Sequence, residues 1–116
     1  RLLEAGASAA IVKGGHVDGE VITDLLATPD GEIFIEHARL TSSSTHGTGC
    51  TLASGLACSL AQGMALEPAL RRAIAYVTEA IRRAPGFGAG AGPLDHAWPT
   101  KNPETAEALG LFSISQ

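Results

Sequence analysis

The sequence is poor in aromatic residues and contains no long hydrophobic run. Aromatic residues make up 4% of its 116 positions, although 45% are hydrophobic and 14 are glycine. A core with so few rings depends on small and aliphatic side chains, which favours close helix-on-sheet packing over a β-sandwich. No apolar stretch approaches the roughly 20 residues of a membrane-spanning helix, and we see no signal peptide. The length predicts at most one domain.

Cysteine and positive charge are also scarce. Cys50 and Cys58 lie on one expected helix, about 12 Å apart at a rise of roughly 1.5 Å per residue, which is too far for a mutual disulfide. A reducing, cytoplasmic setting is the simplest interpretation. Eight Lys and Arg residues against twelve Asp and Glu residues give a net charge of −4. This balance gives no support to a nucleic-acid or membrane-surface partner.

The order of the expected elements indicates the C-terminal half of an α/β protein. Residues 1–7 read as the end of a helix, so we expect the chain to be a fragment. Residues 8–13 are typical of a buried parallel strand. Residues 21–28 and 33–40 predict an antiparallel hairpin around the turn at 29–32. Helices are expected at 49–62, from 66 to just before Pro85, and near 104–109.

Each of the two longer helices is expected to bury one face. In the first helix, these positions are Leu52, Leu56 and Leu60, with Ala53, Ala57 and Ala61 beside them. In the second helix, they are Leu70, Ile74, Val77 and Ile81. The remaining pattern of the second helix places Arg71, Arg72, Arg82 and Arg83 on its solvated face and at its C-terminal end.

The segment His46-Gly47-Thr48-Gly49-Cys50-Thr51, which directly precedes the first long helix, carries the strongest functional signal. Two glycines two positions apart allow a tight turn with exposed backbone N–H groups. The helix N-terminus adds further free N–H groups and a positive dipole end. Together these features predict an anion site. A thiolate at Cys50 would be stabilised by the same field and could serve as a base or nucleophile.

Simpler interpretations remain open for these residues. One alternative is that the glycines do no more than start a helix. Another is that Cys50 is a small core residue, as we expect Cys58 to be. Thr51 is expected to cap the helix. Asp18 and Asp24 are too isolated to form a metal site, and no Cys/His cluster has zinc spacing.

Four motifs together resemble the hydroxymethylpyrimidine/phosphomethylpyrimidine kinases of the ribokinase superfamily. They are Lys13-Gly14-Gly15-His16, Asp24-Leu25-Leu26, residues 45–52 around the glycine turn, and Gly92-Pro93-Leu94-Asp95-His96-Ala97-Trp98. The resemblance runs from about residue 1 to residue 98, in order and at fitting spacing. It implies the C-terminal part of a three-layer α/β/α fold with a mostly parallel sheet, followed by a tail at 99–116.

The resemblance also implies an activity and roles for individual residues. The family transfers the γ-phosphoryl group of ATP, with Mg²⁺, to 4-amino-5-hydroxymethyl-2-methylpyrimidine and then to its monophosphate, in thiamin diphosphate biosynthesis. Cys50 matches the catalytic base, and Gly47, Thr48 and Gly49 match the anion hole. Lys13, Thr45 and His46, with Gly47 and Gly49, match the nucleotide site.

The resemblance further implies a homodimer and metal ligands outside this chain. Ala73 and Val77 could line the adenine pocket or simply pack in the core.

Two other functions remain open from the sequence. The glycine-cysteine turn also occurs in some pyridoxal kinases, so pyridoxal is an alternative substrate. A non-catalytic module that binds nucleotide or pyrimidine phosphate is a second alternative. A thiol-redox function would need a second thiol near Cys50, which Cys58 cannot supply from its own place on the helix.

Overall fold

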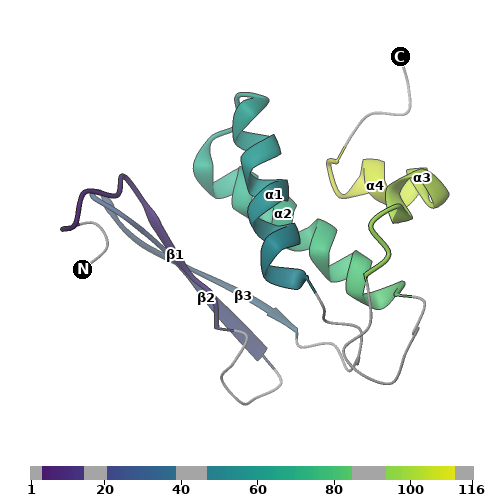
Figure 1. The fold of residues 1–116 in the computed structure, drawn as a ribbon, viewed down its shortest axis with the longest axis horizontal. Coiled ribbons are helices and arrows are strands. Elements are labelled where there is room, and N and C mark those ends of the chain that lie inside the picture. Colours follow the sequence, from purple (N-terminus) through teal and green to yellow (C-terminus); the bar gives the residue numbers. More distant parts are fainter. Residues whose placement is uncertain (1–3, 15–20, 39–46, 85–93, 112–116) are drawn as a thin grey trace. The chain divides into compact units, whose positions relative to one another are not determined.

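The computed structural model describes residues 4–14, 21–38, 47–84 and 94–111. The chain forms two compact units, residues 1–39 and residues 40–116. The first unit is a small sheet and the second is helical (Figure 1). Within the described residues, no helix has both the length and the apolar character required to cross a bilayer.

The sheet unit contains three antiparallel strands in the order β1-β2-β3. They are β1 (Ala10–Val12), β2 (Val21–Thr28) and β3 (Gly31–Ala38). The predicted hairpin is confirmed, but β3 begins two residues earlier than expected. Thr28 pairs directly with Gly31, so Pro29 and Asp30 alone form the connection, as in the commonest hairpin loops.

The prediction of a buried parallel strand at 8–13 was wrong in two respects. β1 pairs antiparallel with β2, through Ile11 opposite Leu26 and Val12 opposite Leu25. Its residues are also half-buried or exposed, and Val12 keeps 54% of its surface. The apolar run did predict a strand. It did not reveal direction, because parallel and antiparallel strands can share such a composition.

One face of the sheet is buried and the other is largely open. Asp24, Leu26 and Ile35 are at most 4% exposed, and the register places them on one face. Phe34 and Val21, on the opposite face, are exposed by 60% and 57%. The period-2 alternation of strands therefore places one carboxylate among the buried apolar side chains.

The helical unit is built on two helices joined by a short turn, α1 (Thr48–Ala61) and α2 (Leu66–Arg82). Both predicted helices are confirmed within two residues at their described ends. Gly63 follows α1 with φ of +88°, and Met64 N–H donates to Ser59 C=O at 3.2 Å. This left-handed glycine ends the helix, as predicted.

The predicted buried face of α1 was largely wrong. Leu52 is buried, but Leu56 is only half-buried and Leu60 is 41% exposed. The three alanines predicted beside them are also exposed: Ala53, Ala57 and Ala61. The side of α1 that packs on α2 carries small residues instead. A Cβ added to Gly55 would lie 3.6 Å from the Cβ of Ala73, and Ser59 is 2% exposed.

The predicted face of α2 is confirmed at three positions. Leu70, Ile74 and Val77 are buried, whereas Ile81 is only partly buried. Arg71 lies on the solvated side and pairs with Glu67 at 2.9 Å.

Two short helices follow, α3 (Trp98–Lys101) and α4 (Pro103–Ala108). The helix expected near 104–109 is confirmed as α4, and α3 was not predicted. Trp98 is fully buried in a cluster with Ala80, Leu94 and Ala106. Its indole N–H donates to Tyr76 C=O at 3.1 Å. The single tryptophan thus anchors the segment after α2 onto that helix.

Candidate active site

The N-terminus of α1 presents backbone donors without any acidic side chain beside them. Gly47 is the N-cap residue with φ of +81°, and it provides no side-chain cap. The first backbone bond runs from Thr51 N–H to Gly47 C=O at 2.9 Å. The N–H groups of Thr48, Gly49 and Cys50 precede it and have no intrahelical acceptor. The first turn of α1 contains no acidic residue, so its positive dipole end is available to an anion.

The two glycines of this turn, Gly47 and Gly49, serve different structural purposes. Gly47 adopts the left-handed conformation that other residues rarely take. Gly49 is a helical residue of the exposed first turn and has no positive φ. The expectation that both glycines allow a tight turn is therefore met at Gly47 only. At Gly49 the missing side chain leaves the backbone N–H groups uncovered.

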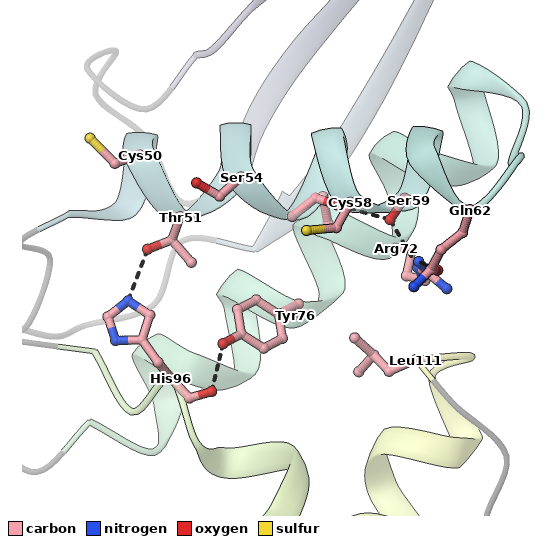
Figure 2. A pocket seen from close by; sticks show the side chains of 12 residues that line it. Cys50, Thr51, Ser54, Cys58, Ser59, Gln62, Arg72, Tyr76, His96 and Leu111 are labelled. Atoms are coloured by element: carbon pink, nitrogen blue, oxygen red, sulfur yellow. Dashed lines mark hydrogen bonds between the residues drawn. The ribbon is translucent and has the colours of Figure 1, made fainter.

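Cys50 lies at the third position of α1 and is exposed, as is Cys58 two turns later. Cys50 therefore sits beside the free donors, with its thiol accessible to a ligand (Figure 2). The expectation that Cys58 is a buried core residue was wrong. The helix presents it to a pocket rather than to packed side chains.

The prediction that Thr51 caps α1 was also wrong. Thr51 lies inside the first turn, and its Oγ1 shares a hydrogen bond of 3.0 Å with His96 Nε2. This bond joins α1 to the segment before α3, across 45 residues of sequence. His96 belongs to the fourth sequence motif, but sequence spacing alone does not show that it lies beside α1.

A pocket of about 500 Å³ lies along α1 and α2. Thr51 and His96 lie side by side at one end of it, and Tyr76 lies further along (Figure 2). Cys50 and Ala73 also belong to its lining. Ala73 is thus both a buried packing residue and part of the wall of this pocket. Val77 is buried and does not line the pocket.

Tyr76 holds the His96 segment in place. Its hydroxyl donates to His96 C=O at 2.6 Å, and its ring lies 6.1 Å from that of Trp98. Burial raises the pKa of Tyr76 above its usual value, and the negative charge of Asp95 raises it further. The hydroxyl therefore stays protonated and can donate at any physiological pH.

Two of the four arginines also make contacts that the prediction of a solvated face and a helix end did not include. Arg72 donates from Nε to the buried Ser59 Oγ at 3.0 Å and also binds Gln62. Arg83 pairs with Glu79 at 3.0 Å and lies 5.7 Å from the centre of the Trp98 ring. Arg82 is exposed and also pairs with Glu79, as a solvated position would allow.

In the sheet unit, a group of polar contacts lies directly after β1. Lys13 is exposed, and the next residue, Gly14, donates its N–H to Asp24 Oδ1 at 2.9 Å. His37 Nε2 lies 2.8 Å from the other oxygen, Asp24 Oδ2. Asp24, which was predicted to be too isolated for a metal site, has these two close polar partners. An Asp in the middle of an apolar strand was the available signal, because strands are depleted in Asp.

Several predicted positions lie outside the described residues, namely Thr45, His46, His16 and Asp18. Among the residues that the structure does describe, no three His, Cys, Asp or Glu side chains converge to hold a metal ion. The described chemistry therefore consists of backbone N–H groups without intrahelical acceptors, an adjacent thiol and a pocket. Such a set can stabilise a phosphoryl group and accept a proton from an attacking hydroxyl.

Most of the chain matches a known protein family. Residues 1–95 match the family described as phosphomethylpyrimidine kinase. The hydroxymethylpyrimidine/phosphomethylpyrimidine kinase of Streptomyces coelicolor is 45% identical over 97 residues, which are 84% of this chain and 36% of that protein. The protein of the same name from Bacillus subtilis is 39% identical over 99 residues, which are 83% of this chain and 36% of that protein.

A solved structure gives the same fold. The pyridoxal kinase from Staphylococcus aureus in complex with AMP-PCP aligns with a TM-score of 0.77 at 30% identity, covering 82% of this chain and 35% of that protein. This likeness confirms the predicted ribokinase-like α/β fold, although the strands described in this chain pair only antiparallel. The chain spans about a third of the length of these relatives. The matches to the family and to its named relatives show that the chain belongs to the phosphomethylpyrimidine kinase family.

Proposed function

We propose that this chain supplies the anion hole and the catalytic base of an ATP-dependent kinase. Its substrates would be 4-amino-5-hydroxymethyl-2-methylpyrimidine and the monophosphate of that compound. The observation that carries the proposal is the start of α1, where three backbone N–H groups, one of them that of Cys50, have no intrahelical acceptor. The relatives named as hydroxymethylpyrimidine/phosphomethylpyrimidine kinases support this substrate class.

In this proposal Cys50 removes the proton from the substrate hydroxyl as its oxygen attacks the γ-phosphorus of ATP. A new P–O bond forms to the substrate, and the bond to the departing ADP oxygen breaks. The negative charge on the transferred oxygens is stabilised by the N–H groups of Thr48, Gly49 and Cys50. These donors are fixed by the helix before the reaction, so stabilising the charge requires little reorganisation.

We assign Lys13 to the ATP phosphates, and Thr45 and His46 to the nucleotide site beside Gly47 and Gly49. Within the part of the chain that the structure describes, no three His, Cys, Asp or Glu side chains gather around a common point. We place the Mg²⁺ ligands and most of the pyrimidine pocket outside these residues, as the family resemblance implies. We assign residues 1–98 to the kinase domain and residues 99–116 to a C-terminal tail. A cytoplasmic homodimer completes the proposal.

Pyridoxal is the second candidate substrate, and the likeness to the Staphylococcus aureus pyridoxal kinase favours testing it. A non-catalytic nucleotide-binding module is the candidate from another class. The decisive assay measures ADP release by the full gene product that contains these 116 residues. The acceptors are hydroxymethylpyrimidine, its monophosphate and pyridoxal, each with ATP and Mg²⁺.

We expect release to depend on either pyrimidine and to be much slower with pyridoxal. The 116 residues expressed alone should be inactive, because they span about a third of the relatives' length. Faster release with pyridoxal would reassign the substrate. Nucleotide binding without release for any acceptor would support the binding-module function.

A further inference from the structure

Asp24 is the one buried carboxylate of the sheet unit's described residues, and it contacts a backbone group beside Lys13. It is 2% exposed and lies on the same face as the buried Leu26 and Ile35. Burying a carboxylate is unfavourable unless strong partners replace its water. Asp24 has two such partners, the Gly14 N–H at 2.9 Å and His37 Nε2 at 2.8 Å.

The backbone at Gly14 is held from a second side. A Cβ at Gly14 would lie far inside van der Waals contact with the carbonyl oxygen of Thr23. The chain therefore leaves β1 pressed against β2, immediately after the paired residues Val12 and Leu25. The Asp24 carboxylate then accepts the Gly14 N–H at the point where strand pairing ends. A charge-assisted bond of this kind is stronger than a neutral one.

We infer that Asp24 is a positioning residue for Lys13. Its carboxylate, oriented by His37, fixes the Gly14 backbone and thereby the backbone of Lys13, the neighbouring residue. The exposed lysine then begins from a defined point at the strand end, so less freedom is lost when its ammonium meets a phosphate. This inference rests on the proposed function, because it takes Lys13 to contact the ATP phosphates. Asp24 itself does not touch the substrate.

The test is a double-mutant cycle in the full gene product, with steady-state kinetics at varied ATP. Asp24→Ala should lower kcat/KM for ATP roughly 10- to 100-fold, mostly through a higher KM. In the Lys13→Ala background the same substitution should cost less than about three-fold, because the residue that it positions is absent. Equal losses in both backgrounds would show a purely structural role and overturn the inference.

Two further variants separate positioning from loss of folding. Asp24→Asn keeps an oxygen that can accept the Gly14 N–H, so it should recover most of the activity lost in Asp24→Ala. Leu26→Ala removes a buried side chain from the same face without touching Gly14, and should lower stability while leaving KM for ATP nearly unchanged. An equal rise in KM for Leu26→Ala would contradict the inference.

A readout independent of activity is amide hydrogen exchange at Gly14. Exchange should be at least ten-fold faster in Asp24→Ala than in Asp24→Asn, and an equal rate in both variants would contradict the proposed anchor. The proposed function can fail separately. If Lys13→Ala leaves KM for ATP unchanged while Gly14 exchange responds as expected, the anchor stands and the assignment of Lys13 to ATP falls.

Discussion

The two units of the chain hold their proposed phosphate-binding segments by different physical means. The sheet unit uses a buried charge, since the Asp24 carboxylate holds Gly14 beside Lys13. The helical unit uses the start of α1, where Gly47 turns the chain and the helix itself orients the donors. It holds the neighbouring His96 segment with a neutral hydroxyl, that of Tyr76. Lys13 depends on a contact from a neighbouring strand to fix its backbone. The backbone donors of α1 are fixed by the helix to which they belong.

Among the glycine and tyrosine substitutions that test this contrast, the largest effect is expected at Gly49, where the helical unit exposes its donors. Gly49→Val places a branched side chain over the first turn of α1 and shields the N–H groups from the phosphate. We expect kcat to fall about 100-fold or more, comparable to losing an oxyanion-hole donor. Gly49→Ala should be milder, because its methyl group is smaller. Unchanged kcat in the valine variant would remove the anion-hole assignment.

The next effect tests crowding in the sheet unit. Gly14→Ala forces a Cβ against the Thr23 carbonyl, and that backbone oxygen cannot rotate away. We expect the free energy of unfolding to fall by about 1–3 kcal/mol, as for other overpacked sites. Urea unfolding of the full gene product measures the change. A stability equal to wild type would mean that this close approach does not exist.

The matching glycine in the helical unit should respond to conformation instead of crowding. Gly47 has φ of +81°, and a Cβ there would have no neighbour within 4 Å. Gly47→Ala should cost about 1–2 kcal/mol of unfolding free energy, the penalty for a left-handed alanine. Gly47→Asn should recover part of this loss, because Asn tolerates that conformation. Gly14→Asn should be no more stable than Gly14→Ala, because crowding and not conformation limits that position. If Asn recovered stability at both positions, the distinction between conformation at Gly47 and crowding at Gly14 would be wrong.

The smallest effect concerns the Tyr76 hydroxyl, which holds the His96 segment through a neutral hydrogen bond. Tyr76→Phe removes the bond to His96 C=O and should lower the free energy of unfolding by about 1 kcal/mol near neutral pH. Burial raises the folded-state pKa of Tyr76 above the usual 10.0, so the folded state keeps this proton longer than the unfolded state. The stabilisation is therefore complete below pH 10 and is lost as pH rises through the folded-state pKa.

Thermal or urea unfolding at a series of pH values measures that loss. The advantage of wild type over Tyr76→Phe should shrink above pH 10. A difference that stays constant through this range would show that the Tyr76 proton is not linked to folding.

The sequence was sufficient to predict elements that depend on local chemistry. The hairpin follows from Pro29-Asp30-Gly31, and both ends of α1 follow from Gly47 and Gly63. Long-range contacts were not predictable in this way. The bond between Thr51 and His96, and the contact of Asp24 with Gly14, join residues whose proximity depends on packing and register.

The exposed side of α1 also shows that packing partners could not be predicted from the sequence. Helical periodicity indicates which residues share a face, such as Leu56 and Leu60, but it does not show which neighbour covers that face. The small residues Gly55 and Ser59 pack on α2 instead. Within the candidate site, the donors at Gly47–Cys50 were predicted because they follow one another in sequence.

The most direct test of the proposed mechanism, in which Cys50 is the catalytic base, compares the two cysteines of α1. Both are exposed on the same helix, but only Cys50 adjoins the free N–H groups. In the full gene product, with saturating hydroxymethylpyrimidine, ATP and Mg²⁺, we expect Cys50→Ala to lower kcat about 10²- to 10⁴-fold, the usual contribution of a general base. ATP affinity should be nearly unchanged, and Cys58→Ala should retain wild-type kcat. Equal kcat for Cys50→Ala and wild type would contradict the proposed mechanism.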